Sequence, residues 1–364
     1  MPKNKFINQI EPLIEKRDIF SVSKYLKTNG WITEHKLNLK FEKLFSSFIR
    51  SKYAVSFPNG TLAIVGILAV LDIKPNDEVI VPNYTMVATA NAVKLLGATP
   101  VFCDISTDNL CMDPMQLKNK INKKTKAIIY VTLNGRSGHI NEIKKIANKN
   151  KLFFIEDSAH SIGSYFGKKH HGNFGIASAF SFSMPKIITT GQGGMVATNN
   201  LHIFKKLKNL KNFGRLSDGN DNYQSIGYNF KFTDLQAALG ISQIQNIKKR
   251  IIKKRKIFNY YNKFLSKVEN IQIFSFKNTE TPWFVDIYLD NPKKLKNYLL
   301  KHKINTRLVY PALNNLKIYS DNRKLKNSSY FCSRGLWLPS SLNLSNEDIR
   351  FICKKIINFF EYEG

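Results

Sequence analysis

The sequence of 364 residues is poor in cysteine. Its four cysteines, Cys103, Cys111, Cys332 and Cys353, show no C-x-x-C spacing, so neither a disulfide framework nor a zinc site is indicated. The histidines include no helical i,i+4 pair with a carboxylate, and we expect the adjacent pair His170-His171 to lie in a surface loop. The sequence therefore predicts no metal centre.

Long hydrophobic runs are also lacking. No apolar stretch approaches the roughly 20 residues that a membrane span requires. The first residues, Met1 to Lys5, lack the apolar segment and the small-residue cleavage site of a signal peptide. We therefore expect a globular protein of the cytoplasm, with enough apolar residues (43%) to fill the core of a large domain and a smaller one.

Acidic residues are scarce, since 26 Asp and Glu stand against 56 Lys and Arg, which gives a net charge of +30. Such a charge is typical of nucleic-acid-binding proteins, but here the lysines are spread over every segment. The densest cluster, Lys248 to Lys256, alternates with apolar residues at helical spacing and is expected to be the solvated side of an amphipathic helix. We expect no nucleic-acid partner. A positive field would still speed encounter with an anionic small molecule such as a nucleotide sugar.

Short apolar runs alternate with helix-length amphipathic stretches from residue 53 onward. This pattern predicts an α/β fold with a mostly parallel sheet of about seven strands, covered by helices on both faces. The expected strands are Tyr53 to Phe57, Val79 to Val81, Pro100 to Ile105, Ala127 to Thr132, Leu152 to Ile155, Ala177 to Phe182 and Met195 to Thr198.

Two helices are expected before this region, and a smaller α+β domain is expected after it. We predict a large domain over residues 1–245, including the lead-in, and a second domain over residues 246–364. The capping-box sequence Thr233-Asp234-Leu235-Gln236 predicts a long helix, out to about Tyr261, that ties the two together. The second domain is expected to contain strands at Trp283 to Leu289 and Arg307 to Tyr310, and helices at Leu295 to Lys303 and Asn346 to Phe360.

One lysine differs from the others in its surroundings. Lys186 lies in a turn that contains Pro185, between two predicted strands, and is flanked by apolar residues, hydroxyls and glycines up to Gly194. An amine there can be desolvated and its pKa lowered, which is what a Schiff-base lysine needs. The alternative is an ordinary loop lysine between two strands.

Two further segments carry residues suited to a ligand. Gly60-Thr61 opens an apolar helix and offers free backbone N–H groups, a hydroxyl and a positive dipole end, which suit a phosphate; the alternative is a plain N-cap threonine. Glu156 and Asp157 close a predicted buried strand, where ligands of open α/β sheets bind. Because side chains alternate along a strand, only one of the two acids is expected to face a ligand. The alternative for this pair is a capping role or a structural ion pair.

Taken together, these motifs resemble the DegT/DnrJ/EryC1/StrS sugar aminotransferases, a pyridoxal phosphate (PLP) family with the fold type I of aspartate aminotransferase. Within the family, the segments around Lys186 and Arg334 look most like perosamine-synthase-type 4-aminotransferases of nucleotide-linked 4-keto-6-deoxy sugars. The resemblance runs through Gly30 to Thr33, Asn59 to Thr61, Pro75 to Pro82, Glu156 to His160, Ser181 to Gly194, Gly227 to Phe230, Gln236 to Ala238 and Leu338 to Ser340.

The resemblance implies a role for each matching position. Lys186 would bond to the cofactor, and Asp157 would pair with its pyridine nitrogen. Gly60, Thr61 and Ser181 would bind its phosphate.

The family's pattern assigns three further positions. His160 would lie near the ring hydroxyl of the cofactor, and Met86 would cover the ring, with Tyr84 as the alternative. Asn229 would reach the cofactor of the neighbouring subunit, which implies a homodimer with shared active sites. L-glutamate would be the amino donor, and a nucleotide-linked keto sugar for surface glycan synthesis the acceptor.

Other departures from the family's pattern leave the acceptor open. Many relatives have Glu where this chain has Gln192, and a histidine where it has Leu313. A small phosphorylated ketone is an alternative acceptor. A related PLP class of sugar dehydratases has histidine at the position of Lys186, so the lysine argues against it. A basic nucleic-acid-binding protein with a degenerate PLP fold is the rival of a different class.

Overall fold

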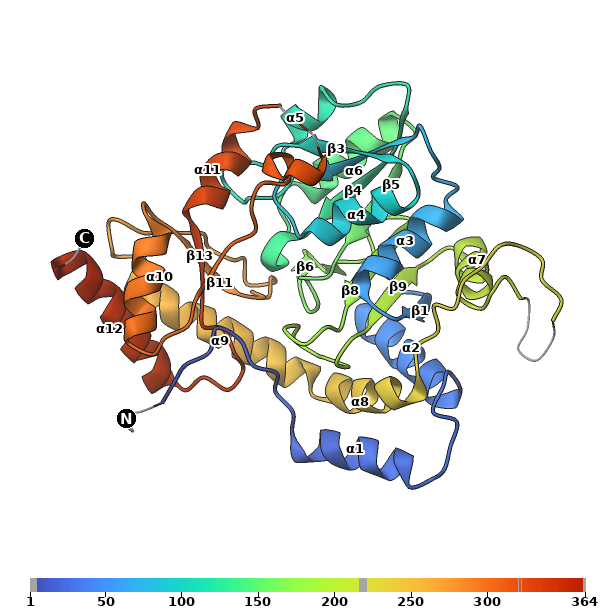
Figure 1. The fold of residues 1–364 in the computed structure, drawn as a ribbon, viewed down its shortest axis with the longest axis horizontal. Coiled ribbons are helices and arrows are strands. Elements are labelled where there is room, and N and C mark those ends of the chain that lie inside the picture. The colour runs from blue at the N-terminus through green and yellow to red at the C-terminus, as the bar shows by residue number, and fades with distance from the viewer. Residues whose placement is uncertain (1–4, 216–220, 320, 322, 363–364) are drawn as a thin grey trace.

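The computed structural model describes residues 5–215, 221–319, 321 and 323–362. Its centre is a seven-stranded sheet with the strand order β1-β9-β8-β5-β4-β2-β3 (Figure 1). The pairs among β2, β3, β4, β5 and β8 are parallel, whereas β9 runs antiparallel to both of its neighbours, so the mostly parallel sheet predicted from the sequence is confirmed. The strands are β1 Tyr53–Phe57, β2 Glu78–Pro82, β3 Thr99–Cys103, β4 Thr125–Val131, β5 Phe153–Asp157, β8 Ala177–Ser181 and β9 Gly194–Thr198.

Helices cover both faces of this sheet because each strand is apolar on both sides. One face packs against α3, α4 and α7. The other face packs against α2 and α8 at one end and α6 at the other. The helices of this part are α1 Lys16–Leu26, α2 Lys36–Ile49, α3 Gly60–Val70, α4 Val87–Leu95, α5 Pro114–Lys118, α6 Ile140–Lys149, α7 Leu201–Lys211 and α8 Asp234–Gln245; a short turn η1 Leu133–Gly135 and a hairpin of β6 Tyr165–Phe166 and β7 Lys169–His170 complete it.

A smaller four-stranded sheet, with the order β10-β11-β13-β12, forms the second part of the molecule. Helices α9, α10 and α12 pack on it, and all of its pairs are antiparallel. The expected strands and helices are present here. The inner strand β13, which follows α11 without an intervening turn residue, is not among the strands predicted from the sequence. The elements are α9 Ile247–Leu265, β10 Gln272–Ile273, β11 Val285–Tyr288, α10 Pro292–Lys301, β12 Arg307–Leu308, η2 Leu313–Asn315, η3 Lys317–Tyr319, α11 Lys326–Arg334, β13 Gly335–Leu338 and α12 Asn346–Tyr362.

The predicted long helix behind Thr233 is wrong in one respect, because the chain forms two helices rather than one. The capping box is present, with Thr233 accepting from the amide of Gln236 at 3.2 Å and Gln236 accepting from the amide of Thr233 at 3.2 Å. The first helix ends at Asn246, whose backbone leaves the helical region with φ −102° and ψ 9°. The side chain of Asn246 also donates to Glu15 of the lead-in at 3.2 Å, a tertiary contact that the local sequence does not show.

The basic cluster on α9 is only partly solvated. Arg250 and Lys254 are buried, contrary to the expectation of a fully solvated basic face. Arg250 pairs with Glu15 and Asp18 of the lead-in, and Lys254 donates to two backbone carbonyls. The helix crosses from α8 to the second sheet (Figure 1), so these side chains meet other elements rather than water.

The N-terminal segment lies along the second part of the molecule. The amide of Ile7 donates to Lys303 at 2.8 Å, and the amide of Asn305 donates to Ile7 at 2.8 Å. The amide of Ser340 donates to the carbonyl of Gln9 at 2.8 Å. Among the described residues, none of the helices has the length and apolar character that crossing a bilayer demands. The division at residue 245 and the cytoplasmic location stay predictions.

Candidate active site

A cavity of about 410 Å³ lies where the carboxyl ends of the parallel strands meet the second part of the molecule. The sheet contributes the residues that follow β1, β2, β5 and β8, and the second part contributes side chains near β11 and β12. The lining residues used below are Gly60, Thr61, Met86, Asp157, His160, Ser181, Lys186, Gln192, Trp283, Arg307 and Tyr310.

Lys186 projects from the connection between β8 and β9 into this cavity. Its amine has no hydrogen-bond acceptor among the described residues and lies 3.8 Å from the ring centroid of Trp283. The indole Nε1 of Trp283 donates to the carbonyl of Pro185 at 2.8 Å, which fixes the turn that carries the lysine. Burial lowers the pKa of Lys186 to about 7, and the charge of Asp157 opposes the shift. A substantial fraction of this amine is therefore neutral and nucleophilic near neutral pH.

Asp157 is the acid that faces the cavity, and it lies at the end of β5. Its Oδ2 accepts from the hydroxyl of Thr89 at 2.7 Å, and its Oδ1 accepts from the amide of Ala159 at 3.1 Å. Burial raises the pKa of Asp157, while these two bonds and the charge of Lys186 favour the carboxylate. A buried carboxylate without an ion-pair partner among the described residues is suited to hold a cationic ligand group.

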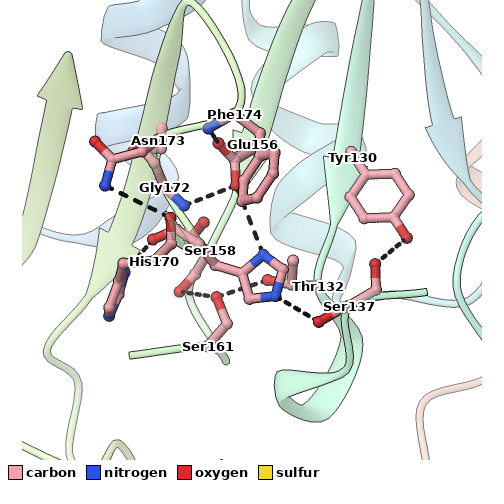
Figure 2. Close-up of polar contacts among 12 residues, drawn as sticks. Tyr130, Thr132, Ser137, Glu156, Ser158, Ser161, His170, Gly172, Asn173 and Phe174 are labelled. Atoms are coloured by element: carbon pink, nitrogen blue, oxygen red, sulfur yellow. Dashed lines mark hydrogen bonds and ion pairs between the residues drawn. The ribbon is translucent and has the colours of Figure 1, made fainter. Parts of the chain in front are cut away.

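Glu156 points toward Gly172 and Phe174 (Figure 2) and does not line the cavity, as alternation along the strand predicts. It accepts from the amides of Gly172 at 2.7 Å, Phe174 at 2.5 Å and Gly175 at 2.8 Å. Glu156 therefore orders a loop rather than a ligand.

The histidine pair next to this loop is buried, so its expected surface position is wrong. His171 bonds through Nε2 to the hydroxyl of Ser137 at 2.9 Å, and its Nδ1 lies 4.0 Å from the carboxylate of Glu156. Burial lowers the pKa of His171 to about 3, so the ring stays neutral. The order Ser-His-Glu resembles a hydrolase triad, but all three side chains are enclosed in the core.

The start of helix α3 forms one end of the cavity. The helix begins at Gly60, so the amides of Gly60 and Thr61 have no carbonyl partner within it. Asn59, rather than Thr61, is the N-cap and accepts from the amide of Leu62 at 2.9 Å, which leaves the Thr61 hydroxyl free of that role. A Cβ on Gly60 would stand 3.0 Å from the Cβ of Ser181, so glycine permits the close approach of helix and strand. Gly60, Thr61 and Ser181 thus lie together at one end of the cavity, where the free helix amides are suited to an anion.

His160 forms the opposite wall together with aromatic rings of the second part. Its imidazole stacks on Trp283 with 4.0 Å between ring centroids and faces Tyr310 at 6.2 Å. The amide of Asn134 donates to its Nδ1 at 3.4 Å. Burial lowers its pKa well below the usual value, so His160 is neutral.

The chain matches the model of the DegT/DnrJ/EryC1/StrS aminotransferase family over residues 12–357. The chain belongs to this family. It is 33% identical to GDP-perosamine synthase of Escherichia coli O157:H7 over 360 residues, which cover 98% of this chain and 99% of that protein. The structure of Helicobacter pylori PseC, an aminotransferase involved in the biosynthesis of pseudoaminic acid, aligns with a TM-score of 0.92 and 28% identity over 98% of this chain and 100% of PseC. The fold class expected from the sequence is confirmed.

A third comparison concerns the fold alone. The putative sugar aminotransferase Spr1654 from Streptococcus pneumoniae, solved in a PLP-form, aligns with a TM-score of 0.92 and 24% identity over 99% of each chain. These findings establish this chain as an aminotransferase, and the degenerate nucleic-acid-binding rival loses its support.

Two residues were candidates for covering a cofactor ring in this aminotransferase. Met86 lines the cavity at the N-cap of α4 and is 42% exposed. Tyr84 is turned into the core, where its hydroxyl lies 3.0 Å from that of Tyr288. Of the two, Met86 lines the cavity and Tyr84 does not.

The other two departures from the family pattern have different locations. Gln192 lines the cavity, and its carbonyl accepts from the side chain of Gln236 at 2.7 Å. Leu313 is fully buried in the large core, so a leucine in place of histidine fills apolar space rather than the cavity wall.

Asn229 lies outside the cavity of its own chain. It is exposed, and its backbone bridges Asn212. The neighbouring side chains of Ile226 and Tyr228 are exposed as well. The predicted reach of Asn229 to a neighbouring subunit therefore stays a prediction that this geometry permits.

Sequence reasoning missed the aromatic and basic wall of the site. Trp283, Arg307 and Tyr310 were assigned only to strands of the second part. Their neighbours carry no recognisable motif, and their approach to Lys186 depends on how the two sheets pack. The sole local signal was a tryptophan beginning an apolar run, which is equally typical of a core strand.

Proposed function

We propose that this aminotransferase uses PLP to move an amino group from L-glutamate to a nucleotide-linked keto-deoxy sugar, for surface polysaccharide or glycan synthesis. The observation that carries the proposal is the pairing of Lys186, with a pKa near 7, and the buried carboxylate of Asp157 on one cavity. A cofactor with both an aldehyde and a basic ring nitrogen needs such a pair, because the lysine reacts with the aldehyde and the aspartate pairs with the protonated nitrogen.

The residues present fit PLP in each of its chemical parts. The phosphate would be held by the amides of Gly60 and Thr61 and the hydroxyl of Ser181, at the positive end of α3. The pyridine nitrogen would meet Asp157, and the aldehyde would meet Lys186. His160 would lie near the ring hydroxyl, and the thioether of Met86 would cover a ring face.

When bound, PLP supplies an electron-withdrawing ring that stabilises negative charge at the carbon losing its proton. Lys186 is the base and acid for this proton, because burial holds its pKa near 7. Asp157 keeps a proton on the partner nitrogen by offering a buried negative charge. Trp283 holds the lysine turn through Pro185 and excludes water from one side of the amine.

The acceptor class rests on relatives and on charge. One relative is named a GDP-perosamine synthase and PseC is described as an aminotransferase of pseudoaminic acid biosynthesis, and both match along nearly the full chain. A net charge of +30 attracts an anionic nucleotide sugar. A small phosphorylated ketone is the second candidate acceptor, because the same positive charge attracts a small phosphate. We infer a homodimer in which Asn229 reaches the partner's cofactor, because Asn229 is exposed and lies outside its own cavity.

The experiment is a screen of nucleotide-linked keto sugars and phosphorylated ketones with L-glutamate, read by the mass of the aminated product. We expect a product that carries nitrogen from labelled glutamate. The purified protein is expected to be yellow, and borohydride should bleach the colour in wild type. Aminated product from phosphorylated ketones but from none of the sugars would overturn the nucleotide-sugar assignment.

A further inference from the structure

We propose that Thr89 is a positioning residue of this aminotransferase: its hydroxyl holds the carboxylate of Asp157 in place and keeps it an anion for the cofactor nitrogen. The inference rests on the proposed function and deepens it. Thr89 is not among the residues that line the cavity, so it would act through Asp157 and not on a substrate.

Thr89 reaches Asp157 from the first turn of α4 and is fully buried. Its hydroxyl donates to Oδ2 of Asp157 at 2.7 Å, a distance typical of a hydrogen bond to a charged oxygen. The amide of Ala159 donates to the other oxygen, Oδ1, at 3.1 Å. Two donors from different segments therefore hold one oxygen each, and together they fix the plane of the carboxylate.

The direction of the hydrogen bonds around Thr89 follows from the number of protons. A hydroxyl has one proton, and an ionised carboxylate can only accept, so the proton of Thr89 points to Asp157. The hydroxyl of Thr85, 3.2 Å away and also buried, therefore donates to Thr89. Thr85 and Thr89 thus form a chain of two hydroxyls whose dipoles both favour the charged form of Asp157.

The charged and titratable groups that face Asp157 give it no constant positive partner. The charge of Lys186 favours the carboxylate, but the pKa of this amine is about 7, and the same nitrogen would bond to the cofactor. His160 is neutral, and Tyr310 is un-ionised because burial raises its pKa. Arg307 lines the cavity as well but forms no ion pair with Asp157. The support of the carboxylate must therefore come from fixed hydrogen bonds.

Among these bonds, the one from Thr89 has the largest effect. Burial raises the pKa of Asp157, and of the interactions that lower it again the Thr89 hydroxyl comes first, ahead of the Ala159 amide and the charge of Lys186. Without this hydroxyl, the proton that the mechanism needs on the cofactor nitrogen would be bound by the carboxylate instead.

The same turn of helix carries the residue that would cover the cofactor ring. Met86 is the N-cap of α4 and lines the cavity, and its carbonyl accepts from the amide of Thr89 at 3.2 Å. One turn of backbone therefore links the ring cover to the support of the acid. A substitution that changes only the side chain of Thr89 should leave Met86 in place.

The test compares two substitutions of Thr89 in the PLP-saturated holoenzyme. Thr89→Val keeps the shape of the side chain and removes the hydroxyl, whereas Thr89→Ser keeps the hydroxyl and removes a methyl group. We expect Thr89→Val to slow the single-turnover release of 2-oxoglutarate from L-glutamate by about 10- to 100-fold at saturation, with the half-saturating L-glutamate concentration little changed. Thr89→Ser should keep most of the wild-type rate.

Thr198→Val is the matched control for the loss of a buried hydroxyl. Thr198 ends β9, is buried and donates to the carbonyl of Ile176 at 2.7 Å, but it does not line the cavity. We expect both valine variants to lower the melting temperature, and Thr198→Val to keep the wild-type rate in folded molecules. A wild-type rate in Thr89→Val, or an equal loss of rate in Thr89→Ser, would overturn the proposal.

A double-mutant cycle shows whether Thr89 acts through Asp157. In the Asp157→Asn background the carboxylate is absent, so adding Thr89→Val should cause no further loss of rate. Losses that multiply as independent effects would instead show that Thr89 acts elsewhere, against the proposal.

The carboxylate can also be titrated directly in the cofactor-free protein. In protein labelled with carbon-13 at the aspartate carboxyl, the Asp157 signal in NMR is the one missing from Asp157→Asn. Its midpoint should rise by about 1 pH unit in Thr89→Val and stay near that of wild type in Thr89→Ser. An unchanged midpoint in Thr89→Val would contradict the role of Thr89. If wild type binds no PLP or aminates no nucleotide-linked sugar, the proposed function fails, while this titration still tests Thr89.

Discussion

Lys186 and Lys254 have the same chemistry in two different surroundings. Burial lowers the pKa of each to about 7, and both contact Trp283. Lys186 lies over the indole ring and faces the cavity. Lys254 donates to the carbonyls of Trp283 at 2.5 Å and Ser340 at 2.6 Å from within the core. A lowered pKa alone therefore does not mark a catalytic lysine; an unpartnered amine with access to a cavity does.

The two lysines also contact different parts of Trp283. Lys254 fixes the backbone where the chain enters β11, and the ring then projects toward Lys186. The ring nitrogen returns to Pro185 and closes the arrangement. One lysine thus positions the wall that desolvates the other.

Among the substitutions that test this comparison, Lys186→Ala should have the largest effect. We expect transamination to fall by roughly 10,000-fold or more, because the base and nucleophile of the site are lost together. The melting temperature should change little, since the amine has no hydrogen bond to a described residue that would be broken. Steady-state rates with L-glutamate measure the effect. Near wild-type turnover would contradict the role of Lys186.

Amine labelling of the cofactor-free protein tests whether a reagent can reach each lysine, independently of the pKa that the two lysines share. At pH 7 an amine with a pKa near 7 holds roughly 1,000-fold more neutral form than an ordinary lysine. We expect pulsed acetylation of Lys186 to reach half its maximal rate near pH 7. Lys254, with the same pKa, should stay unmodified in the folded protein. Mass spectrometry of peptides reads both sites, and equal labelling of the two would remove the distinction.

Asp157→Asn tests the acid that faces the cavity. We expect the activity to fall by roughly 100- to 1,000-fold, because a neutral amide does not hold a proton on its partner nitrogen. Glu156→Gln is the control from the adjacent position. It replaces one of the two oxygens that accept from the loop amides by an NH2 group and should cost about 1 to 3 kcal/mol of stability while folded molecules keep their activity. Rate and urea unfolding of each variant measure the two effects, and the reverse pattern would contradict the assignment.

The smallest expected effect is that of Lys254→Met, which should change how the unfolding free energy of the protein depends on pH. Between pH 7 and about 10 the unfolded chain holds a proton on this lysine that the folded protein has released, so Lys254 makes wild type more stable as pH rises. The variant lacks this contribution. The difference in unfolding free energy between the two proteins should change by about 1 kcal/mol per pH unit in this window. Urea titrations at pH 7 and 9 test it, and a constant difference would show that Lys254 has an ordinary pKa.

The elements of the large sheet could be predicted because each strand is a short apolar run buried on both faces. Three site residues could be predicted because the residues next to them in the sequence indicate their role: Lys186, Asp157 and Gly60. The break at Asn246 and the burial of His170 and His171 could not, since they depend on contacts with the lead-in and with the loop bonded to Glu156.

The wall of the cavity that the smaller sheet contributes could not be predicted from the local sequence. Trp283, Arg307 and Tyr310 reach the cavity only because the smaller sheet packs against the carboxyl edge of the larger one. Nothing in the residues around Arg307 distinguishes it from the dozens of other basic residues. What sets it apart is its position on the cavity wall, which is a property of three-dimensional packing.

The backbone bonds that join residue 7 to residues 303 and 305 also set an order of assembly. During synthesis the strands of the large sheet, residues 53–198, emerge long before the segment that pairs with Ile7 and Gln9. Ile7 and Gln9 can therefore make these bonds only after residues 303, 305 and 340 have been synthesised. Because Gln9 lines the cavity as well, the lining is complete only once this contact between segments distant in the sequence has formed.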